Sequence, residues 1–382
     1  MRRTKCVIVA VILVATLFSG CNVREDQLKD MALAQALGID FKDESYNVSF
    51  MIYDLSKNRG SSAELSGALT KVFKGGGESV PYAITNLTTL IGKKPYYSHN
   101  RVVIVGEEMA KDGLQTVFDF LYRNAEMRPY VLVAIARGEA QEILGADFGE
   151  VLNPAEEIQN VIMVGAYYSY VPQTEIVDIA ITTLEKTSDS YLPIVELSKD
   201  GDSELVKASG TAIFNKMKLA GELNEEETKG LLWVNNQIQY GTLVCSTSTQ
   251  NMVSAEIIDA NTEVDVSVEN GKIKYTIKAS CALNIDQVDG KETNSLSREQ
   301  MQEIEQTYAQ TIKKQISSAI DKCLGEYKSD VFRFGKRLWQ KHPETYREIS
   351  DNWRESFSEL EFEIDAKVQV SKTGEEGVDI NE

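Results

Sequence analysis

The clearest secondary-structure signal in the chain is EVDVSVENGKIKYTIKAS, residues 263–280. Three valines alternate with polar residues, Asn270-Gly271 follows, and Ile273, Tyr275 and Ile277 then alternate in the same way. Alternation at every second residue places the apolar side chains on one face of a strand, and an Asn-Gly pair favours the positive backbone angles of a tight turn. The stretch therefore predicts a β-hairpin with one buried face and one solvated face.

The sequence around this hairpin adds helices and one more strand. Asn224 and Ser297 each stand three places before a Glu or Gln, which is the spacing of a capping box. Asn224 therefore predicts the start of a helix over 225–235, and Ser297 predicts the start of a long amphipathic helix. A second helical region is expected at about 330–356, and the alternating EFEIDAKVQV at 361–370 predicts a strand that closes the sheet. We expect a C-terminal domain with an antiparallel hairpin sheet covered by a long helix.

The N-terminal half has an α/β pattern. The apolar stretches RVVIV (101–105) and YVLVAIA (130–136) flank an amphipathic helix at about 109–121, which predicts a right-handed βαβ unit with buried parallel strands. Residues 22–55 predict two strands joined by a polar turn, and residues 79–91 predict a helix. The fold class is therefore mixed α+β and α/β, multidomain, with mixed sheets and flanking helices.

Residues 56–77 carry a weaker signal. They are rich in Ser, Gly and Lys, and Gly75-Gly76-Gly77 is followed by Glu78 instead of the GK[ST] ending of a phosphate-binding loop. We predict a flexible loop here, interrupted by a short element at 63–73.

Residues 153–186 predict helix with a break at Pro172, and contain a cluster of aromatic and apolar side chains. We expect this cluster to belong to the core, with partner contact and ligand stacking as the alternatives. Its members are Val161, Met163, Val164, Tyr167, Tyr168 and Tyr170.

Composition limits the classes of function. The 382 residues include 40 basic and 58 acidic side chains, and the net charge of −18 argues against nucleic-acid binding and against electrostatic binding to anionic lipid. Hydrophobic residues at 42% and charged residues at 26% are typical of globular domains, and the length fits two or three of them. The polar stretch at 196–207 is the candidate boundary, which gives domains at 21–200 and 201–375.

The first residues have the form of a lipoprotein signal peptide, assigned to 1–20. Three basic residues precede an apolar run at 6–18, which is too short to cross a hydrocarbon core that needs about 20 helical residues. Leu-Phe-Ser-Gly then precedes Cys21, which resembles a bacterial lipobox with Phe18 in place of the usual leucine. We predict lipidation at Cys21, with a plain signal peptide as the alternative; two acyl chains anchor a protein stably.

Catalytic, metal and cofactor sites are not expected. The chain has two histidines, His99 and His342, which are far apart, and it lacks the common nucleophile, zinc-binding and dinucleotide-binding motifs. Cys245, Cys281 and Cys323 form no C-x-x-C pair. We expect them to be buried and inert. The alternative is that two of them form a disulfide and the third is a free thiol.

Several stretches, taken in order, resemble the Ger(x)C family, the lipoprotein C subunits of GerA-type nutrient germinant receptors in endospore-forming Firmicutes. The most specific strings are LNEEETKGLLW at 223–233 and DNW at 351–353. The segment from YYSHNRVVIVGEEMA through ARGEAQEIL, residues 96–144, and the segment SDVFRFGKRLW at 329–339 add to the resemblance, which covers essentially the whole chain. Arg333 stands where the family more often has a glycine.

The resemblance implies a non-enzymatic receptor subunit. Such proteins are held by lipid (palmitate among the acyl chains) on the extracytoplasmic face of the spore inner membrane or cell membrane, and they act with multi-pass membrane subunits of A and B type to trigger spore germination. The family attributes nutrient binding chiefly to those subunits, so no ligand-binding residue is assigned. The family fold of three α/β domains implies a further division near residue 150.

Two other classes compete with this interpretation. A lipid-anchored extracytoplasmic solute-binding protein requires two α/β lobes of similar size around a cleft, which the hairpin-and-helix half does not suggest. An anchored hydrolase requires a nucleophile beside a base.

Overall fold

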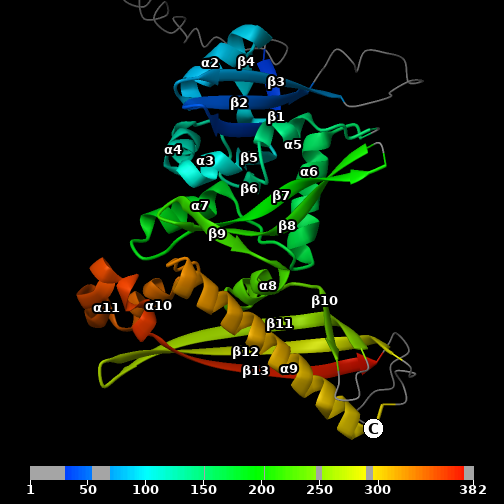
Figure 1. Cartoon of the computed structure of the whole chain (residues 1–382), viewed down its shortest axis with the longest axis vertical. Helices are drawn as coiled ribbons and strands as arrows, with labels where there is room; N and C mark the ends of the chain where they lie inside the picture. The colour runs from blue at the N-terminus through cyan, green and yellow to red at the C-terminus, as the bar shows by residue number, and fades with distance from the viewer. Residues whose placement is uncertain are drawn as a thin grey trace, which may run out of the picture.

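The computed structural model describes residues 31–53, 69–149, 151–201, 203–246, 252–289 and 296–373. Within these ranges the chain forms two β-sheets, one of nine strands and one of four. Figure 1 shows the two sheets at opposite ends of an elongated molecule, with the long helix α9 (Arg298–Ile320) lying against the smaller sheet. The mixed α+β fold with flanking helices is thus confirmed.

The larger sheet has the order β3-β2-β1-β5-β6-β7-β8-β9, with the short β4 paired to β1. Its central strands β1, β5, β6 and β7 run parallel, whereas β2, β3, β8 and β9 join as antiparallel hairpins. The predicted parallel βαβ unit is confirmed by β5 and β6, both entirely buried. The strands are β1 (Met31–Lys42), β2 (Ser45–Tyr53), β3 (Thr70–Gly77), β4 (Lys94–Tyr96), β5 (Val102–Gly106), β6 (Leu132–Ala136), β7 (Tyr191–Asp200), β8 (Ser203–Asn215) and β9 (Lys218–Leu223).

Helices cover both faces of this sheet. The helix expected at about 109–121 is two helices in the structure, because Gly113 has a φ of +137°, a conformation that only glycine adopts easily and that interrupts the helical ladder. The helices are α2 (Val80–Ile91), α3 (Glu107–Asp112), α4 (Gln115–Arg123), α5 (Ala140–Gly145), α6 (Pro154–Tyr167) and α7 (Ile176–Leu184), with a 3₁₀ turn η3 (Tyr97–His99).

The prediction of a flexible loop at Gly75-Gly76-Gly77 was wrong. These glycines end the edge strand β3, which pairs with β2, and α2 lies directly over them. A Cβ added at Gly75 would lie 2.6 Å from the Cβ of Leu87, so the glycine permits close helix–strand packing instead of mobility. Residues 54–68, which include most of the short element expected at 63–73, lie outside the described residues.

The candidate domain boundary at 196–207 falls within the β7–β8 hairpin. The two strands pair from Tyr191 to Asp200, and β9 then extends the same sheet to Leu223. A charged, solvated hairpin tip has the composition of a linker, which explains why the sequence suggested a boundary there. The pairing between β6 and β7 also continues the sheet past residue 150. The division of the chain into domains at residue 200, and again near 150, stays a prediction.

The smaller sheet has the order β10-β11-β12-β13. The hairpin expected from the sequence is confirmed and is longer than the quoted stretch: Glu269 pairs with Lys272, and Asn270 and Gly271 both have positive φ. The closing strand is confirmed too, and it runs parallel to β12. The strands are β10 (Thr242–Ser246), β11 (Met252–Glu269), β12 (Lys272–Val288) and β13 (Glu361–Thr373).

Both predicted capping boxes are present. Asn224 caps α8 (Glu225–Val234) and Ser297 caps α9, and in each box the third residue bonds back to the cap. These helices bury the apolar face of the smaller sheet. The remaining elements are the π-helical turn η5 (Asp321–Glu326), α10 (Phe334–Lys341), α11 (Pro343–Ile349), η6 (Ser350–Asn352) and η7 (Glu355–Glu359). None of the helices in the described ranges has the length and apolar composition that crossing a bilayer requires.

Candidate functional site

Cys21, the predicted lipidation site, lies outside the described residues, as do the signal peptide and the lipobox.

Cys245, Cys281 and Cys323, the cysteines among the described residues, are free thiols in the interior of the C-terminal half. Burial raises the pKa of Cys281 to about 12 and raises that of Cys245 and Cys323 as well. A thiol must ionise to act as a nucleophile or metal ligand, so these groups stay protonated and unreactive at neutral pH. The prediction that these cysteines are buried is confirmed, and their raised pKa values agree with the expectation that they are inert.

The two histidines lie in separate places. His99 is exposed in η3, with its ring 6.0 Å from that of Tyr96, and His342 contacts the carbonyl of Val266 at 3.3 Å between α10 and α11. Across the ranges that the structure describes, no group of three His, Cys, Asp or Glu side chains is arranged to hold a metal ion.

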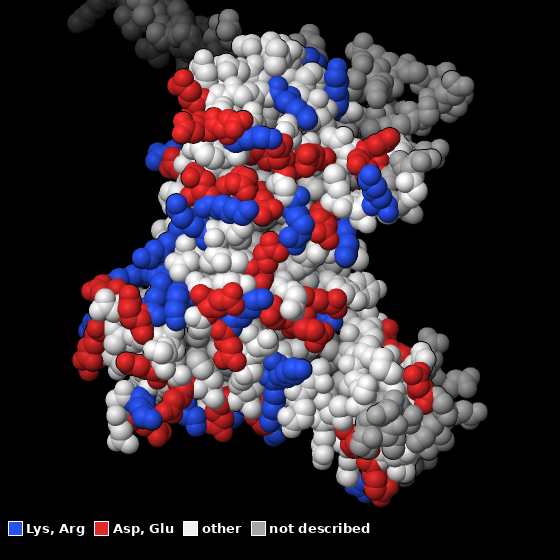
Figure 2. Space-filling view, in the orientation of Figure 1, with Lys and Arg blue, Asp and Glu red and all other residues white. Residues whose placement is uncertain are grey.

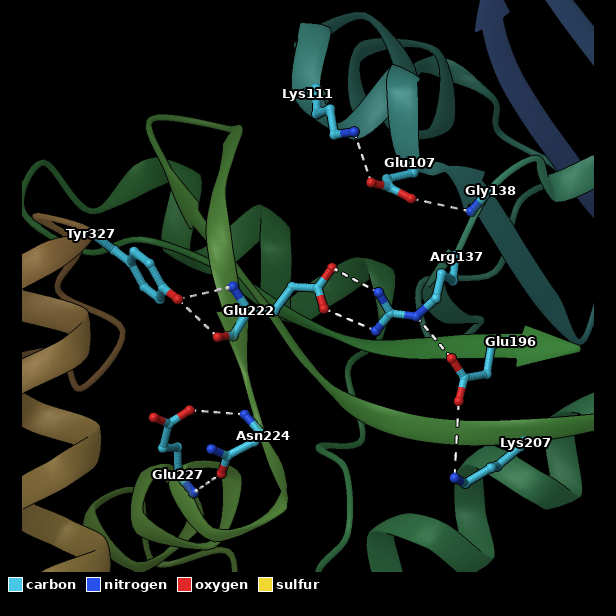
Figure 3. A network of polar contacts seen from close by, with 10 residues as sticks. All are labelled: Glu107, Lys111, Arg137, Gly138, Glu196, Lys207, Glu222, Asn224, Glu227 and Tyr327. Carbon is cyan, nitrogen blue, oxygen red and sulfur yellow. Dashed lines mark hydrogen bonds and ion pairs between the residues drawn. The ribbon is translucent and has the colours of Figure 1, made fainter. Parts of the chain in front are cut away.

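A polar cleft lies where the larger sheet meets α8 (Figure 3). Arg137, just after β6, donates at 2.8 Å to Glu196 on β7 and at 2.9 Å to Glu222 on β9. The hydrogen bonds to Glu222 raise the pKa of this guanidinium, so it is permanently charged. Nζ of Lys207 on β8 lies 3.9 Å from the carboxylate oxygen of Glu196 that does not accept from Arg137. The network therefore clamps three neighbouring strands together across their exposed face.

The same cleft connects to both halves of the molecule. Glu107 accepts from Lys111 at 2.7 Å and from the backbone of Gly138 at 3.2 Å, which fixes the start of α3 beside Arg137 (Figure 3). On the opposite side, the hydroxyl of Tyr327 donates to the carbonyl of Glu222 at 2.8 Å. The ring of Tyr327 occupies the space that a Cβ at position 221 would need, since its Cε1 lies 2.2 Å from that point.

The hollow in this cleft has a volume of about 440 Å³. Its basic groups are held by carboxylates: Arg137 by Glu222 and Lys322 by Glu227 at 2.9 Å. No histidine or cysteine lines it, and the paired charges are of the kind that hold strands and helices in register. Its lining residues are Arg137, Tyr170, Lys207, Ala208, Ser209, Gly210, Glu222, Leu223, Asn224, Glu225 and Lys322.

The string LNEEETKGLLW comprises Leu223, which ends β9, the N-cap Asn224 and all of α8 except its last residue. Gly230 faces the carbonyl of Gln315, where an added Cβ would approach to 2.0 Å, so the two helices cross at a position that only glycine permits. Gln315 is buried, accepts from the Trp233 indole at 3.1 Å and donates to Glu226 at 2.8 Å. The residues that carry the family resemblance therefore specify helix packing.

A buried carboxylate pair joins the two halves of the chain. Asp189, just before β7, accepts from Arg354 at 2.6 Å and from the backbone of Asp330 at 3.0 Å. Asp330 in turn accepts from the backbone of Phe334 and from the indole of Trp353. Burial raises the pKa of Asp330 to about 6. Trp353 is the last residue of the DNW string, so this string too serves the joint between the two halves.

Ion pairs surround this joint. The carboxylate of Glu185, just after α7, accepts a hydrogen bond from Nε of Arg333 at 2.8 Å and pairs with Nζ of Lys336 at 2.7 Å. Arg333 has a φ of +59°, the left-handed conformation in which glycine is most easily placed. The glycine that the resemblance implies at this position would suit the backbone, and the arginine of this chain adds a contact across the joint. Sequence reasoning missed Asp189, Asp330 and Glu185, because the contacts that they make across the joint, Asp189 with Asp330 and Glu185 with Arg333, join positions more than 140 residues apart.

The predicted cluster on α6 lies at the surface, so the expectation of a core position was wrong for all of its members except Val161, which is partly buried and packs against the core. Side chains spaced by four along the helix, Ile158, Ile162 and Ala166, face the sheet and are buried. Tyr167 and Tyr168 lie away from the sheet, are 47% and 40% exposed, and pack on the ring of Tyr240, with centroids 5.3 and 5.2 Å away. Met163, Val164 and Tyr170 are exposed beside them. We call the following six residues the tyrosine surface: Met163, Val164, Tyr167, Tyr168, Tyr170 and Tyr240.

Comparison with known proteins agrees with the resemblance in the sequence. The model described as "Spore germination protein N-terminal domain" matches residues 24–197, and the model described as "Spore germination B3/ GerAC like, C-terminal" matches residues 209–374. Among relatives from Bacillus subtilis (strain 168), YfkR is 28% identical and covers 98% of both chains. Spore germination protein KC is 25% identical and covers 97% of this chain and 96% of its own.

The crystal structure of the GerBC protein has the same fold. It matches 87% of this chain and 96% of its own length, with a TM-score of 0.60 and 21% sequence identity. Both family models, the full-length relatives and this fold lead to one conclusion: the chain belongs to the Ger(x)C family of spore germination proteins, the C-subunit type of germinant receptor.

Proposed function

We propose that this chain is the lipid-anchored C subunit of a spore nutrient germinant receptor and that it acts without catalysis. It is held through Cys21 on the extracytoplasmic face of the spore inner membrane or cell membrane, and it triggers germination together with multi-pass A and B type subunits. The observation that carries the proposal is the match of two family models to nearly all of the chain after Cys21.

The anchor is supported by the sequence at Cys21, and one substitution tests it. Cys21→Ala is expected to take up no labelled fatty acid, because the acceptor thiol is gone. Cys245→Ala, at a buried thiol in the described fold, is the matched control and is expected to take up as much label as the wild type. Label retained by Cys21→Ala contradicts the anchor.

A part in a receptor complex is supported by the exposed tyrosine surface. Tyrosine is enriched at protein interfaces because its ring contributes area while its hydroxyl keeps a polar contact. We propose that the membrane subunits contact this chain there, through Tyr167, Tyr168 and Tyr240. The apolar hollow of about 640 Å³ beside α6, lined by Val164 and Leu205 among others, widens the available contact.

Co-purification from spore inner membranes tests this role. The wild-type chain is expected to bring down multi-pass subunits of A and B type, and the double variant Tyr167→Ala/Tyr168→Ala is expected to recover several-fold less of them. Tyr130→Ala, at a tyrosine that is 72% exposed and is not a member of the tyrosine surface, is the control and is expected to keep full recovery. Wild-type protein recovered without either subunit contradicts the receptor role.

The solute-binding alternative is less well supported. Such proteins place a ligand between two lobes of similar size, whereas the two sheets here have nine and four strands. The cleft between the larger sheet and α8 holds its cations in ion pairs with carboxylates of the chain itself.

A further inference from the structure

The outer face of α2 lies beside the point where the chain enters the described fold. Met31, the first described residue, pairs with Lys94 at the start of β4, and Lys94 follows α2 by three positions. Figure 1 shows α2 and β4 together at one end of the elongated molecule, the end opposite the smaller sheet. Any segment that leads from Cys21 to Met31 therefore joins the fold next to the C-terminal end of α2.

The composition of this helix differs from that of the rest of the chain. Residues 79–92 contain no charged side chain, although 26% of the whole chain is charged. Ala83 and Leu87 face the sheet and are buried, whereas Tyr82 and Leu90 are 55% and 69% exposed. The exposed Lys93 follows. The top of the molecule in Figure 2 is accordingly a mostly uncharged surface.

The length of the segment before Met31 limits how far this end can lie from an anchor. Met31 stands ten positions after Cys21, and ten extended residues span at most about 35 Å. The chain as a whole carries a charge of −18, so anionic headgroups repel most of its surface. The uncharged face of α2 has Lys93 beyond its C-terminal end, on the side where Met31 pairs with β4, and the exposed Glu78 before its N-terminal end. This face approaches such headgroups at least cost near Lys93, and tyrosine is enriched at the depth of the headgroups.

We propose that the outer face of α2, through Tyr82, Leu90 and Lys93, rests on the lipid headgroups and so fixes the orientation of the molecule on the membrane. The proposal rests on the proposed anchor at Cys21, because two exposed large side chains are too few to hold the chain on a bilayer alone. The smaller sheet and α9 then point away from the bilayer, and the tyrosine surface lies between these two ends.

Depth-dependent quenching tests this orientation. The lipidated full-length protein with Leu90→Cys carries an environment-sensitive fluorophore and is reconstituted on vesicles of phosphatidylcholine and phosphatidylglycerol that contain a spin-labelled lipid. Leu184→Cys is the matched control, because Leu184 is 87% exposed at the end of α7, away from α2. The native Cys245, Cys281 and Cys323 are buried and do not react, lipidation consumes the thiol of Cys21, and Cys6 lies in the signal peptide that processing removes.

The expected result is quenching at position 90 at least about threefold stronger than at position 184, since groups on an interfacial face lie within ~10 Å of the headgroup boundary. Protein that floats with the vesicles but is quenched equally at both positions refutes the membrane contact of α2 and leaves the anchor intact. Protein that does not float with the vesicles refutes the anchor, and the orientation proposal with it. Both substitutions are at exposed positions, so neither is expected to disturb folding.

Discussion

Replacing Asp330 with alanine tests whether the buried carboxylate pair holds the two halves together. Asp330 is fully buried, and its two oxygens accept from the backbone amides of Phe334 and Gly335 at 2.9 and 2.8 Å and from the Trp353 indole at 3.0 Å. Its own backbone amide donates to Asp189. Asp330→Ala removes the acceptor and leaves three buried donors without their partner.

The size of the effect follows from two opposing contributions. Each buried donor left without a partner costs about 1–3 kcal/mol. The substitution also removes a poorly solvated charge: burial raises the pKa of Asp330 from 3.8 to about 6, and each pKa unit corresponds to about 1.4 kcal/mol at neutral pH. With about 2 kcal/mol for each of the three donors and about 3 kcal/mol regained by removing the charge, the net loss in the free energy of unfolding is about 3 kcal/mol.

Urea unfolding at pH 7, followed by tryptophan fluorescence, measures this loss. Trp233, Trp339 and Trp353 all belong to the C-terminal half, so the signal reports on the side of the joint that contains Asp330. The midpoint is expected to fall by about 1 M urea, given a slope of about 3 kcal/mol/M. Asp351→Ala, at a side chain that is 81% exposed, is the control and is expected to change the free energy by less than about 0.5 kcal/mol. Equal midpoints for the two variants would refute the reasoning.

Three further substitutions probe backbone, packing and charge. Arg333→Gly is expected to be about 1 kcal/mol more stable than Arg333→Ala, because both lose the same ion pair but only alanine keeps a strained positive φ; equal melting temperatures contradict this. Gly75→Ala is expected to cost about 1–3 kcal/mol, because its Cβ would lie 2.6 Å from the Cβ of Leu87. Gly76→Ala is expected to cost less in thermal unfolding, because its Cβ would come no closer than 3.2 Å to any neighbour, the side-chain oxygen of Asn47. Burial raises the pKa of Asp40 from 3.8 to about 6, so the folded chain binds the proton of this carboxyl group more tightly than the unfolded chain does. The folded state therefore loses stability as the pH rises from about 4 to about 6. Asp40→Asn is expected to reduce that loss by roughly 2–3 kcal/mol in urea titrations followed by circular dichroism, and an unchanged pH profile contradicts it.

Much of the local structure could be predicted from the chain alone. The Asn270-Gly271 turn, the Asn224 and Ser297 caps and the buried strands around 102–106 and 132–136 all appear as expected. Each of these signals acts over a few neighbouring residues: a turn requires particular backbone angles, a cap satisfies nearby amides, and strand burial requires continuous apolar side chains.

The errors occurred where a residue's environment depends on distant parts of the chain. Glycine is favoured both by mobile loops and by close packing, and only the position of Leu87 on α2 decides that Gly75 serves packing. A run of tyrosines at helical spacing suits either a core or a surface, and the choice depends on which side of α6 meets the sheet.

The sequence by itself determined the hairpin, the helix caps, the apolar strands and, through the Ger(x)C strings, the family. Only the tertiary structure decided which charged residues meet across the joint, as Asp189 with Arg354 and Glu185 with Arg333 do, and which uncharged face lies next to the first described strand. The physical reason is that backbone propensity and side-chain periodicity act over a few residues. Contacts between elements more than a hundred positions apart depend instead on how the sheets and helices pack, which no local pattern encodes.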